Sequence, residues 1–288
     1  MKTWRFRKAA AFLTALPLYV FTIAFVAGPL VLMVAISFLS RGESWGYVLE
    51  PTLRNYKGIF EPAYTAAFAQ SIKLALVSTV ASVLVGYPFG YFMARLSPEW
   101  RSRCMVLLII PFWTSSLMRL YGWMTIFRAN GVLDSALMAI GVIKEPLKLL
   151  YSFPAVAVGM VYTLVPFMIY SVFSSAEKLD WSLVEAARDL GASPAQAFLT
   201  VILPLTMPGL YSGIVLTFIP SMGLYFIADL LGGSKIALVG NIIQEQMMRV
   251  HNMPLAAAFS VVLMGLTSLC LLAYRKLAKT GELEGLIQ

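Results

Sequence analysis

Long apolar blocks separated by short charged segments make up most of this chain. Six stretches lack Asp, Glu, Lys and Arg, and most of them reach the ~20 residues that cross the apolar core of a bilayer. The third stretch reaches that length only when it is extended past Arg119, and Pro204 divides the fifth into a surface segment and a span. The pattern predicts an all-α integral membrane protein with about six transmembrane helices in a single domain, residues 1–288. We expect the spans at about residues 12–38, 70–94, 104–127, 152–174, 206–228 and 254–274.

Proline and glycine occur inside the predicted spans. Proline removes a backbone donor, and in lipid such a break persists only where neighbouring helices or water satisfy the freed carbonyl groups. Spans interrupted in this way, as at Pro88, are typical of a protein that moves or encloses a path. The glycine pairs Gly86 with Gly90 and Gly209 with Gly213 predict close helix contacts, which tight packing is enough to explain.

Composition supports a membrane protein. Hydrophobic residues make up 59% of the 288 residues and charged residues only 12%, whereas soluble domains carry about 25% charged residues. The first apolar run follows several Lys and Arg residues, as a secretory signal does. It is about twice as long as a signal core of roughly 7–15 residues, so we expect it to remain as a membrane anchor.

The net charge of +8 could suggest a nucleic-acid-binding protein. The basic residues lie beside the predicted spans, however, where the positive-inside rule expects them, so we expect no nucleic-acid partner. Six spans put both termini on one side, and that side carries more Lys and Arg than the other. We therefore expect both termini, and the loop 175–205, in the cytoplasm.

Residues typical of an enzyme or of a nucleotide site are missing from the sequence. No G-x-x-x-x-G-K-[ST] phosphate loop occurs, since Gly232–Lys235 lacks the spacing and does not open a helix after a strand. Cys104 and Cys270 lie far apart in apolar surroundings, and the single histidine, His251, cannot form a metal cluster alone. We expect a chain that is not itself an enzyme and that binds no cofactor or metal.

The predicted cytoplasmic loop 175–205 begins with a short amphipathic helix. Ser182 followed three residues later by Glu185 matches a capping box, and Asp180 is an alternative N-cap. Gly191 suits the left-handed residue that ends a helix. The apolar residues that share one face at helical spacing are Leu183, Ala187 and Leu190.

A second short helix is predicted directly after the first. Ser193 is its N-cap, Pro194 lies in its first turn, and Gln196 completes a capping box. We expect this helix to end against Pro204. Two short helices joined at a glycine would form a rigid projection from the membrane, although composition alone is more typical of an ordinary interfacial loop.

The order of residues in this loop favours a specific function. Glu185–Ala187 is followed after three residues by Gly191, and after nine more by Val201–Pro204. This pattern resembles the E-A-A motif of bacterial ABC importer permeases, with valine where isoleucine is usual. The resemblance implies the type I importer permease fold, in which the two helices are coupling helices that dock in a groove of a separate ATPase. The residues implied in ATPase coupling are Glu185, Ala186, Ala187, Gly191, Ser193, Leu203 and Pro204.

Further stretches resemble the B-type permease subunit of bacterial spermidine/putrescine importers, from about residue 50 to about residue 260. The resemblance implies that polyamines cross the bacterial inner membrane by alternating access. It also implies a heterodimer with a second related permease, two ATPase subunits that bind ATP and Mg, a periplasmic polyamine-binding protein, and surrounding membrane lipid. The similar stretches are Thr52–Tyr56, Pro111–Gly122, Glu185–Ser193, Pro204–Gly209 and Ala228–Gly233.

A polyamine path would need acceptors for ammonium groups and aromatic faces for cation–π contacts. The first candidate is Asp229, at the outer end of the fifth span beside Tyr225 and Phe226, because an ionisable group at membrane depth is costly. Its alternatives are a structural pair with Arg119 or an exposed span end. Glu245 is the second candidate. The alternative to substrate contact is that its segment simply forms a helix lying in the outer interface.

Several aromatic residues are further candidates for lining the path, although aromatic belts at the membrane surface explain most such residues. A positive charge such as that of Arg119 is unfavourable on a route for cations. We therefore expect either that a carboxylate neutralises Arg119 or that Arg119 has a structural role. The aromatic candidates are Trp113, Tyr121, Trp123 and Tyr162.

Two classes of alternative remain open. Within the same architecture, the solute could be an opine, a phosphonate or ferric iron, because a separate binding protein largely sets the substrate. Outside it, a membrane enzyme would need a cluster of catalytic His, Asp or Glu residues, which the sequence lacks. A passive channel would have no use for a docking element.

Overall fold

The computed structural model describes residues 16–43 and 46–284, which divide into two compact units. The first unit comprises residues up to Pro62 together with Ile242–Gly265, and the second comprises Ala63–Asn241 together with the residues from Leu266 onward. Three helices contribute residues to both units: α13, α14 and, by Pro62 alone, α4.

The first unit joins an apolar helix to a β-hairpin. The side chain of Asn55 donates to the carbonyl oxygens of Ser37 and Leu39, each at 2.9 Å, and the hydroxyls of Ser37 and Tyr56 share a hydrogen bond of 2.7 Å. These bonds fix the end of the helix against α3. Its elements are the helix Leu16–Ser37, which includes η1 (Ile23–Ala27) and α2 (Gly28–Ser37), the strands β1 (Leu39–Arg41) and β2 (Tyr47–Pro51), α3 (Arg54–Gly58), and parts of α13 (Val239–Met248) and α14 (Met253–Glu284).

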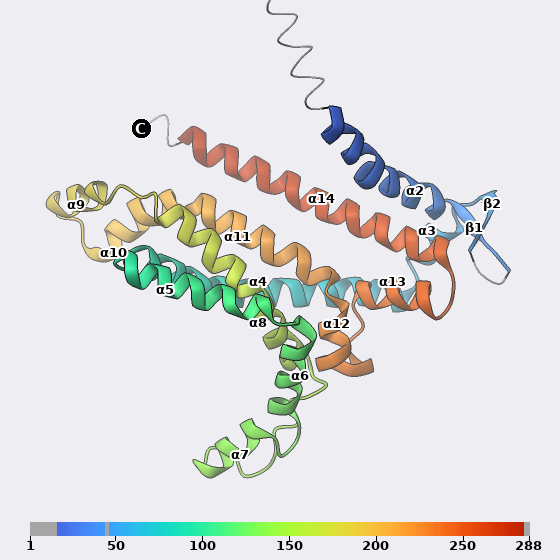
Figure 1. The fold of residues 1–288 in the computed structure, drawn as a ribbon, viewed down its shortest axis with the longest axis horizontal. Coiled ribbons are helices and arrows are strands. Elements are labelled where there is room, and N and C mark those ends of the chain that lie inside the picture. The colour runs from blue at the N-terminus through green and yellow to red at the C-terminus, as the bar shows by residue number, and fades with distance from the viewer. Residues whose placement is uncertain (1–15, 44–45, 285–288) are drawn as a thin grey trace, which may run out of the picture. The chain divides into compact units, whose positions relative to one another are not determined.

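The second unit is helical and contains the predicted cytoplasmic loop. Figure 1 shows α8 and α11 side by side, with α9 and α10 at one end of α8 and α6 and α7 at the other. Its elements are α4 (Pro62–Ala94), α5 (Pro98–Ile109), η2 (Ile110–Trp113), α6 (Ser116–Phe127), α7 (Val132–Ala139), α8 (Phe153–Ala176), α9 (Trp181–Asp189), α10 (Pro194–Ala197), η3 (Phe198–Ile202), α11 (Leu203–Gly223), α12 (Tyr225–Ile227), η4 (Ala228–Gly232) and η5 (Gly233–Lys235).

The prediction of an all-α membrane protein with about six spans is confirmed. Among the described residues, five helices are long and apolar enough to cross a membrane, and a bent pair of helices makes a sixth. The start of the first expected span, residues 12–15, lies outside the described part. The candidate spans are Leu16–Ser37, Pro62–Ala94, Phe153–Ala176, Pro194–Gly223, Met253–Tyr274, and the pair Pro98–Trp113 with Ser116–Ala139.

The third span differs from the expected single helix 104–127. It bends by 93° between η2 and α6, where Thr114 and Ser115 take extended backbone angles. At this turn the carbonyl group of Pro111 accepts hydrogen bonds from the Thr114 backbone N–H at 3.3 Å, from the Thr114 hydroxyl at 2.8 Å and from the Arg119 guanidinium. Arg119 therefore has the structural role that was one of its two expectations.

The helix that contains the fifth span begins earlier than expected, because Pro204 does not end the preceding helix. The chain is helical from Pro194 to Gly223, and a π turn, η3, lies directly before α11. Proline lacks an N–H and its ring meets the carbonyl group four residues earlier, so the wider π turn accommodates it. The expected division at Pro204 is wrong, and the helical break falls instead at Leu224, before residue 228.

Glycines on two helices allow close packing against α8. A methyl group added at Gly90 of α4 would lie 2.6 Å from the Ile169 carbonyl oxygen, and one added at Gly209 of α11 would lie 2.6 Å from the Ser171 carbonyl oxygen. Such distances leave no room for a side chain. The glycine pairs of the sequence therefore form two close helix contacts, both with α8, whose residue Met168 is fully buried.

Candidate functional site: the helical knob and the Asp229 carboxylate

The predicted loop 175–205 forms the helices α9 and α10 and the turn η3, which we call the knob (residues 181–202). Residues 177–180 connect it to α8, and η3 continues without a break into α11. The knob therefore extends from two of the apolar helices at one end of α8 (Figure 1).

Asp180, the alternative cap, begins α9. Its carboxylate accepts a hydrogen bond of 3.0 Å from the backbone N–H of Ser182, so Ser182 is an internal residue of the helix. Hydrogen bonds from the side chain and backbone of Ser182 hold the pKa of Asp180 below its usual value. The stabilisation by this cap is complete above the unfolded pKa and is lost as the pH falls through the lowered folded value.

Gly191 ends α9 in the left-handed conformation that its position predicted, with φ of +90°. The backbone N–H of Gly191 donates to the carbonyl of Arg188 at 2.9 Å, and that of Ala192 donates to the carbonyl of Ala187 at 3.0 Å. These two bonds form a Schellman motif. The glycine is needed for its backbone angle, since an added methyl group would meet no described atom within 4 Å.

The predicted capping box at the start of α10 is present. The backbone N–H of Ser193 donates to the Gln196 side chain at 2.8 Å, and the backbone N–H of Gln196 donates to the Ser193 hydroxyl at 3.3 Å. Farther along, Leu203 is half-buried and Pro204 is exposed in the first turn of α11. The coupling residues of the sequence thus lie along one continuous segment, and two of them shape its turns.

One face of the knob is open to solvent. Glu185 and Ala186 are exposed on α9 and Ala187 is half-buried. The apolar residues Leu183 and Leu190, expected to share a face, are 48% and 90% exposed. An exposed acidic residue beside small and apolar residues suits a protein partner that approaches closely.

An adjoining face of α9 lies against the end of α4. A cavity of about 260 Å³ lies between them, and its lining includes Trp181, Val184 and the exposed Glu185 of α9 together with Tyr91 and Arg95. Neither Tyr91 nor Arg95 was singled out as a site residue from the sequence. The only signal for them is an aromatic and a basic residue four positions apart at a helix end.

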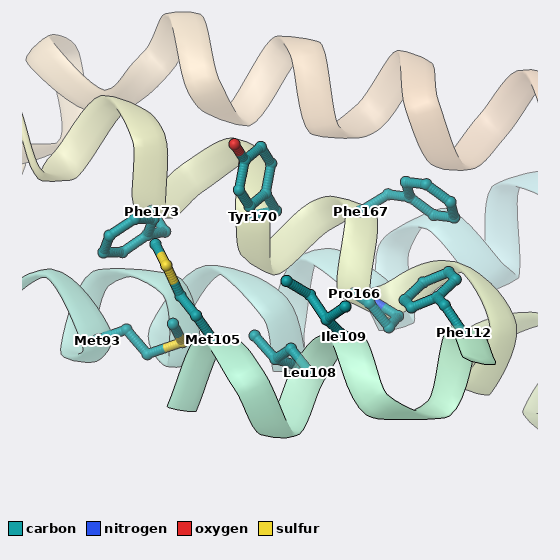
Figure 2. A pocket seen from close by; sticks show the side chains of 9 residues that line it. All are labelled: Met93, Met105, Leu108, Ile109, Phe112, Pro166, Phe167, Tyr170 and Phe173. Atoms are coloured by element: carbon teal, nitrogen blue, oxygen red, sulfur yellow. The ribbon is translucent and has the colours of Figure 1, made fainter. Parts of the chain in front are cut away.

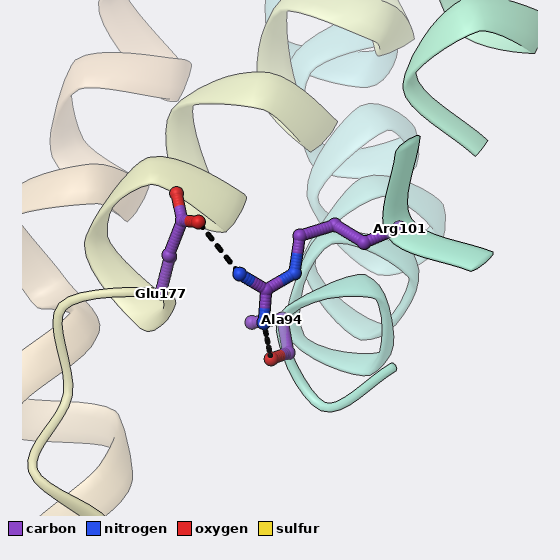
Figure 3. Close-up of polar contacts among 3 residues, drawn as sticks. All are labelled: Ala94, Arg101 and Glu177. Carbon is purple, nitrogen blue, oxygen red and sulfur yellow. Dashed lines mark hydrogen bonds and ion pairs between the residues drawn. The ribbon is translucent and has the colours of Figure 1, made fainter. Parts of the chain in front are cut away.

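A second contact joins the same end of α4 to α8. Arg101 of α5 donates to Glu177 at 2.7 Å and to the carbonyl oxygen of Ala94 at 3.0 Å (Figure 3). Both charged side chains are partly exposed, so this ion pair contributes about 0.2–1 kcal/mol. The contact thus joins the segments 95–103 and 175–205 at the same end of α8.

Asp229 lies in the turn η4 and is exposed. Its carboxylate accepts a hydrogen bond of 2.5 Å from the side chain of Asn241, which also donates to the carbonyl oxygen of Tyr225 at 3.3 Å. The rings of Tyr225 and Phe226 meet edge to face with centroids 6.3 Å apart. Asn241, which the sequence did not indicate, thus links the carboxylate of the first candidate to the backbone of Tyr225.

The other path candidates lie on other elements. Glu245 is exposed on α13, in its part that belongs to the first unit. In the second unit, Trp113 at the end of η2 and Tyr121 on α6 are also exposed. Tyr162 meets the ring of Trp123 edge to face at 5.5 Å.

Arg119 makes no ion pair with a carboxylate in the described part of the chain, so its expected alternative pairing with Asp229 is absent there. Besides Pro111, its guanidinium contacts Ser116 and lies over the rings of Phe112 and Tyr162 at 5.7 and 5.8 Å. The positive charge is held between aromatic faces.

An apolar pocket of about 400 Å³ opens between α4, α5, η2 and α8 (Figure 2). The hydroxyl of Tyr170 is the polar side-chain group among its lining residues, and no carboxylate lines it. The pocket therefore does not suit a polycation. Its lining residues are Met93, Met105, Leu108, Ile109, Phe112, Pro166, Phe167, Tyr170 and Phe173.

Comparison with known proteins agrees with this architecture. The family described as "Binding-protein-dependent transport system inner membrane component" matches residues 86–279. The "Spermidine/putrescine transport system permease protein PotB" of Haemophilus influenzae is 40% identical over 93% of this chain and 93% of its own length. Its Escherichia coli namesake is 41% identical over 91% of this chain and 97% of its own.

A solved structure shows a similar fold. A chain of a bacterial alginate ABC transporter, in complex with an alginate pentasaccharide-bound periplasmic protein, superposes with a TM-score of 0.75 at 14% identity, covering 97% of this chain and 98% of that chain. At that identity the likeness concerns the fold alone.

Proposed function

Because this chain belongs to the family of binding-protein-dependent transport system inner membrane components, we propose that it is the permease subunit of an ABC importer that carries polyamines across the bacterial inner membrane. The observation that carries this proposal is the 40–41% identity, over more than nine-tenths of the chain, to two proteins named for spermidine and putrescine transport. The helices long enough to span a membrane supply the scaffold.

ATP hydrolysis belongs to a partner in this proposal, and this chain is not an enzyme. ATP and Mg would be bound by two copies of a separate ATPase, one of which receives the knob. The exposed residues Glu185 and Ala186, together with the rigid turn at Gly191, support this role. The carboxylate of Glu185 would meet a basic group, and Ala186 would allow close approach. Ser193, Leu203 and Pro204 would act through the shape of the segment that joins the knob to α11.

The complete importer would contain two further partners. A second related permease would form a heterodimer with this chain, surrounded by membrane lipid, and a periplasmic protein would deliver the polyamine. Both termini would lie in the cytoplasm, because the more basic predicted side faces inward. In such a complex, closure of the ATPases would move the knobs and open the cavity outward, and hydrolysis would reset it.

Asp229 is the proposed acceptor for an ammonium group of the polyamine. Its carboxylate is exposed and is positioned by Asn241, which also donates to the backbone carbonyl of Tyr225. A carboxylate suits a primary ammonium group, which can make a charge-assisted hydrogen bond with it, and the exposed ring of Tyr225, packed on that of Phe226, offers a face for a cation–π contact. Glu245, Trp113 and Tyr121 are the further path residues of this proposal.

Reconstitution tests the proposal. The chain is purified with its related permease and ATPase, placed in proteoliposomes with ATP inside, and supplied with binding protein loaded with radiolabelled spermidine or putrescine. We expect ATP-dependent uptake and ATPase activity that rises with loaded binding protein. Uptake of an opine, a phosphonate or ferric iron in place of polyamines would show that the proposed substrate is wrong. Flux without ATP would indicate a channel.

A further inference from the structure

The knob is connected through the chain to α8 and to α11. In addition, it has a third attachment, made by side chains at the end of α4. Two residues of α4, Tyr87 and Tyr91, and Arg95 just after its end are spaced four positions apart, as on one helical face. We call them the α4 stripe. Arg95 directly follows the last residue of α4, so the stripe extends from a buried position to the helix end.

The two tyrosines of the stripe meet the knob through aromatic contacts. The ring of Phe198, the first residue of η3, lies edge to face with Tyr87 and with Tyr91, in each case with centroids 6.1 Å apart. Tyr91 also lies 6.1 Å from the ring of Trp181, the first residue of α9. Both halves of the knob therefore touch the same helix.

Arg95 completes the attachment. Its guanidinium lies over the ring of Tyr91 at 5.9 Å and over that of Trp181 at 5.4 Å, both within the ~6 Å at which a cation is attracted to a ring face. One side chain thus ties the start of α9 to the end of α4. The small cavity between α9 and α4 lies beside this contact.

The α4 helix is in turn fixed to both helices from which the knob extends. Gly90 lies against the backbone of α8, where an added methyl group would be 2.6 Å from the Ile169 carbonyl oxygen. The hydroxyl of Tyr87 shares a buried hydrogen bond of 2.7 Å with that of Thr206 on α11. A displacement of α9 would therefore displace α4 as well as α8 and α11.

We infer that Arg95 is a positioning residue for energy coupling, which holds α9 against the end of α4 so that movement of the knob enters the membrane through α4 in addition to α11. This inference rests on the proposed docking of the knob on an ATPase. Arg95 touches neither ATP nor polyamine in this role. It sets how much of the ATPase movement reaches the membrane helices.

The test compares Arg95→Gln with Arg95→Lys and with a matched control. Arg103→Gln is that control, because Arg103 lies 4.8 Å over the ring of Trp100, on its own helix α5, and this cation–π contact joins no second element. Each variant is reconstituted with the second permease, the ATPase and loaded binding protein. The measured quantity is the number of ATP molecules hydrolysed per polyamine taken up.

We expect Arg95→Gln to raise this ratio about threefold, the factor expected for loss of one cation–π contact at an exposed site, while the ATPase still co-purifies. Arg95→Lys keeps a cation over the rings and should fall between Gln and wild type, and Arg103→Gln should match wild type. Trp181→Leu should raise the ratio as Arg95→Gln does, and combining the two should add little.

A contact that only stabilises the fold would lower hydrolysis and uptake together and leave their ratio unchanged, and that result would overturn the inference. Loss of the ATPase from the Arg95→Gln complex would also overturn it, by making Arg95 part of the docking surface. If the wild-type complex fails to bind an ATPase or to take up polyamine, the proposed function fails instead.

Discussion

Tyr87 on α4 and Thr206 on α11 share a hydrogen bond of 2.7 Å between their hydroxyl groups, at positions where Tyr87 is largely buried and Thr206 is fully buried. The Thr206 hydroxyl also lies 2.8 Å from the carbonyl oxygen of Ile202, to which it donates its one hydrogen. On this ground we assign Tyr87 as the donor in the pair. This assignment makes the two partners unequal.

Removing either hydroxyl should have a different effect on stability. Tyr87→Phe takes away the donor and leaves Thr206 bonded to Ile202, so we expect a loss of about 0.5–1 kcal/mol in the free energy of unfolding. Thr206→Val leaves the tyrosine hydroxyl buried without its acceptor, and should cost about 1–3 kcal/mol. Thermal unfolding in detergent measures both. Equal losses would mean that the donor assignment is wrong.

Gly209 should tolerate no side chain. An added methyl group would lie 2.6 Å from the Ser171 carbonyl oxygen of α8, so Gly209→Val must separate two packed helices. We expect a loss of about 3 kcal/mol or more in the free energy of unfolding. Gly122→Ala on α6 is the control, since no described neighbour lies within 4 Å of the added group, and should change stability by no more than about 0.5 kcal/mol.

Gly191 should be replaceable only by residues that accept a positive φ. Gly191→Asn adds a side chain that tolerates the left-handed region, whereas Gly191→Val places a β-branched residue there. We expect the valine variant to weaken ATPase binding about tenfold, corresponding to about 1.4 kcal/mol of backbone strain at the turn, and the asparagine variant to lose much less. Titration of the reconstituted permease with ATPase measures this. Equal binding by both variants would exclude the turn from docking.

Asp229 should be required for uptake and not for assembly. Because its carboxylate is exposed, Asp229→Asn should leave the complex intact while lowering uptake about tenfold at limiting polyamine, as expected for loss of a charge-assisted contact of about 1.5 kcal/mol. Asn241→Leu frees the carboxylate from its partner and should produce a smaller loss. Unchanged affinity and rate in Asp229→Asn would remove this residue from the path.

Local features of the site could be predicted from the sequence. The capping box of Ser193 with Gln196 and the left-handed turn at Gly191 depend on residues within one turn of each other. The choice between Asp180 and Ser182 as the cap of α9 could not be made, because both side chains stand at positions that suit it.

Features that depend on distant residues could not be predicted. The contact of Arg95 with Trp181 joins residues far apart in the sequence, and neither residue type is unusual at a membrane surface. The passage of the helix through Pro204 depends on a π turn, which has no clear sequence signal. The bend after Trp113 was missed because an uncharged run satisfies the length of a span whether or not it is straight.

Accessibility of Ala186 from each side of the membrane tests the central claim most directly. In a background with Cys104→Ser and Cys270→Ser, Ala186→Cys is treated with a membrane-impermeant thiol reagent, and Leu49→Cys, on the exposed strand β2, serves as the control for the outer side. We predict that Ala186→Cys is labelled only from the cytoplasmic side and that bound ATPase protects it, while Leu49→Cys is labelled from outside and is indifferent to the ATPase. Labelling of Ala186→Cys from the outer side of intact cells would contradict the account.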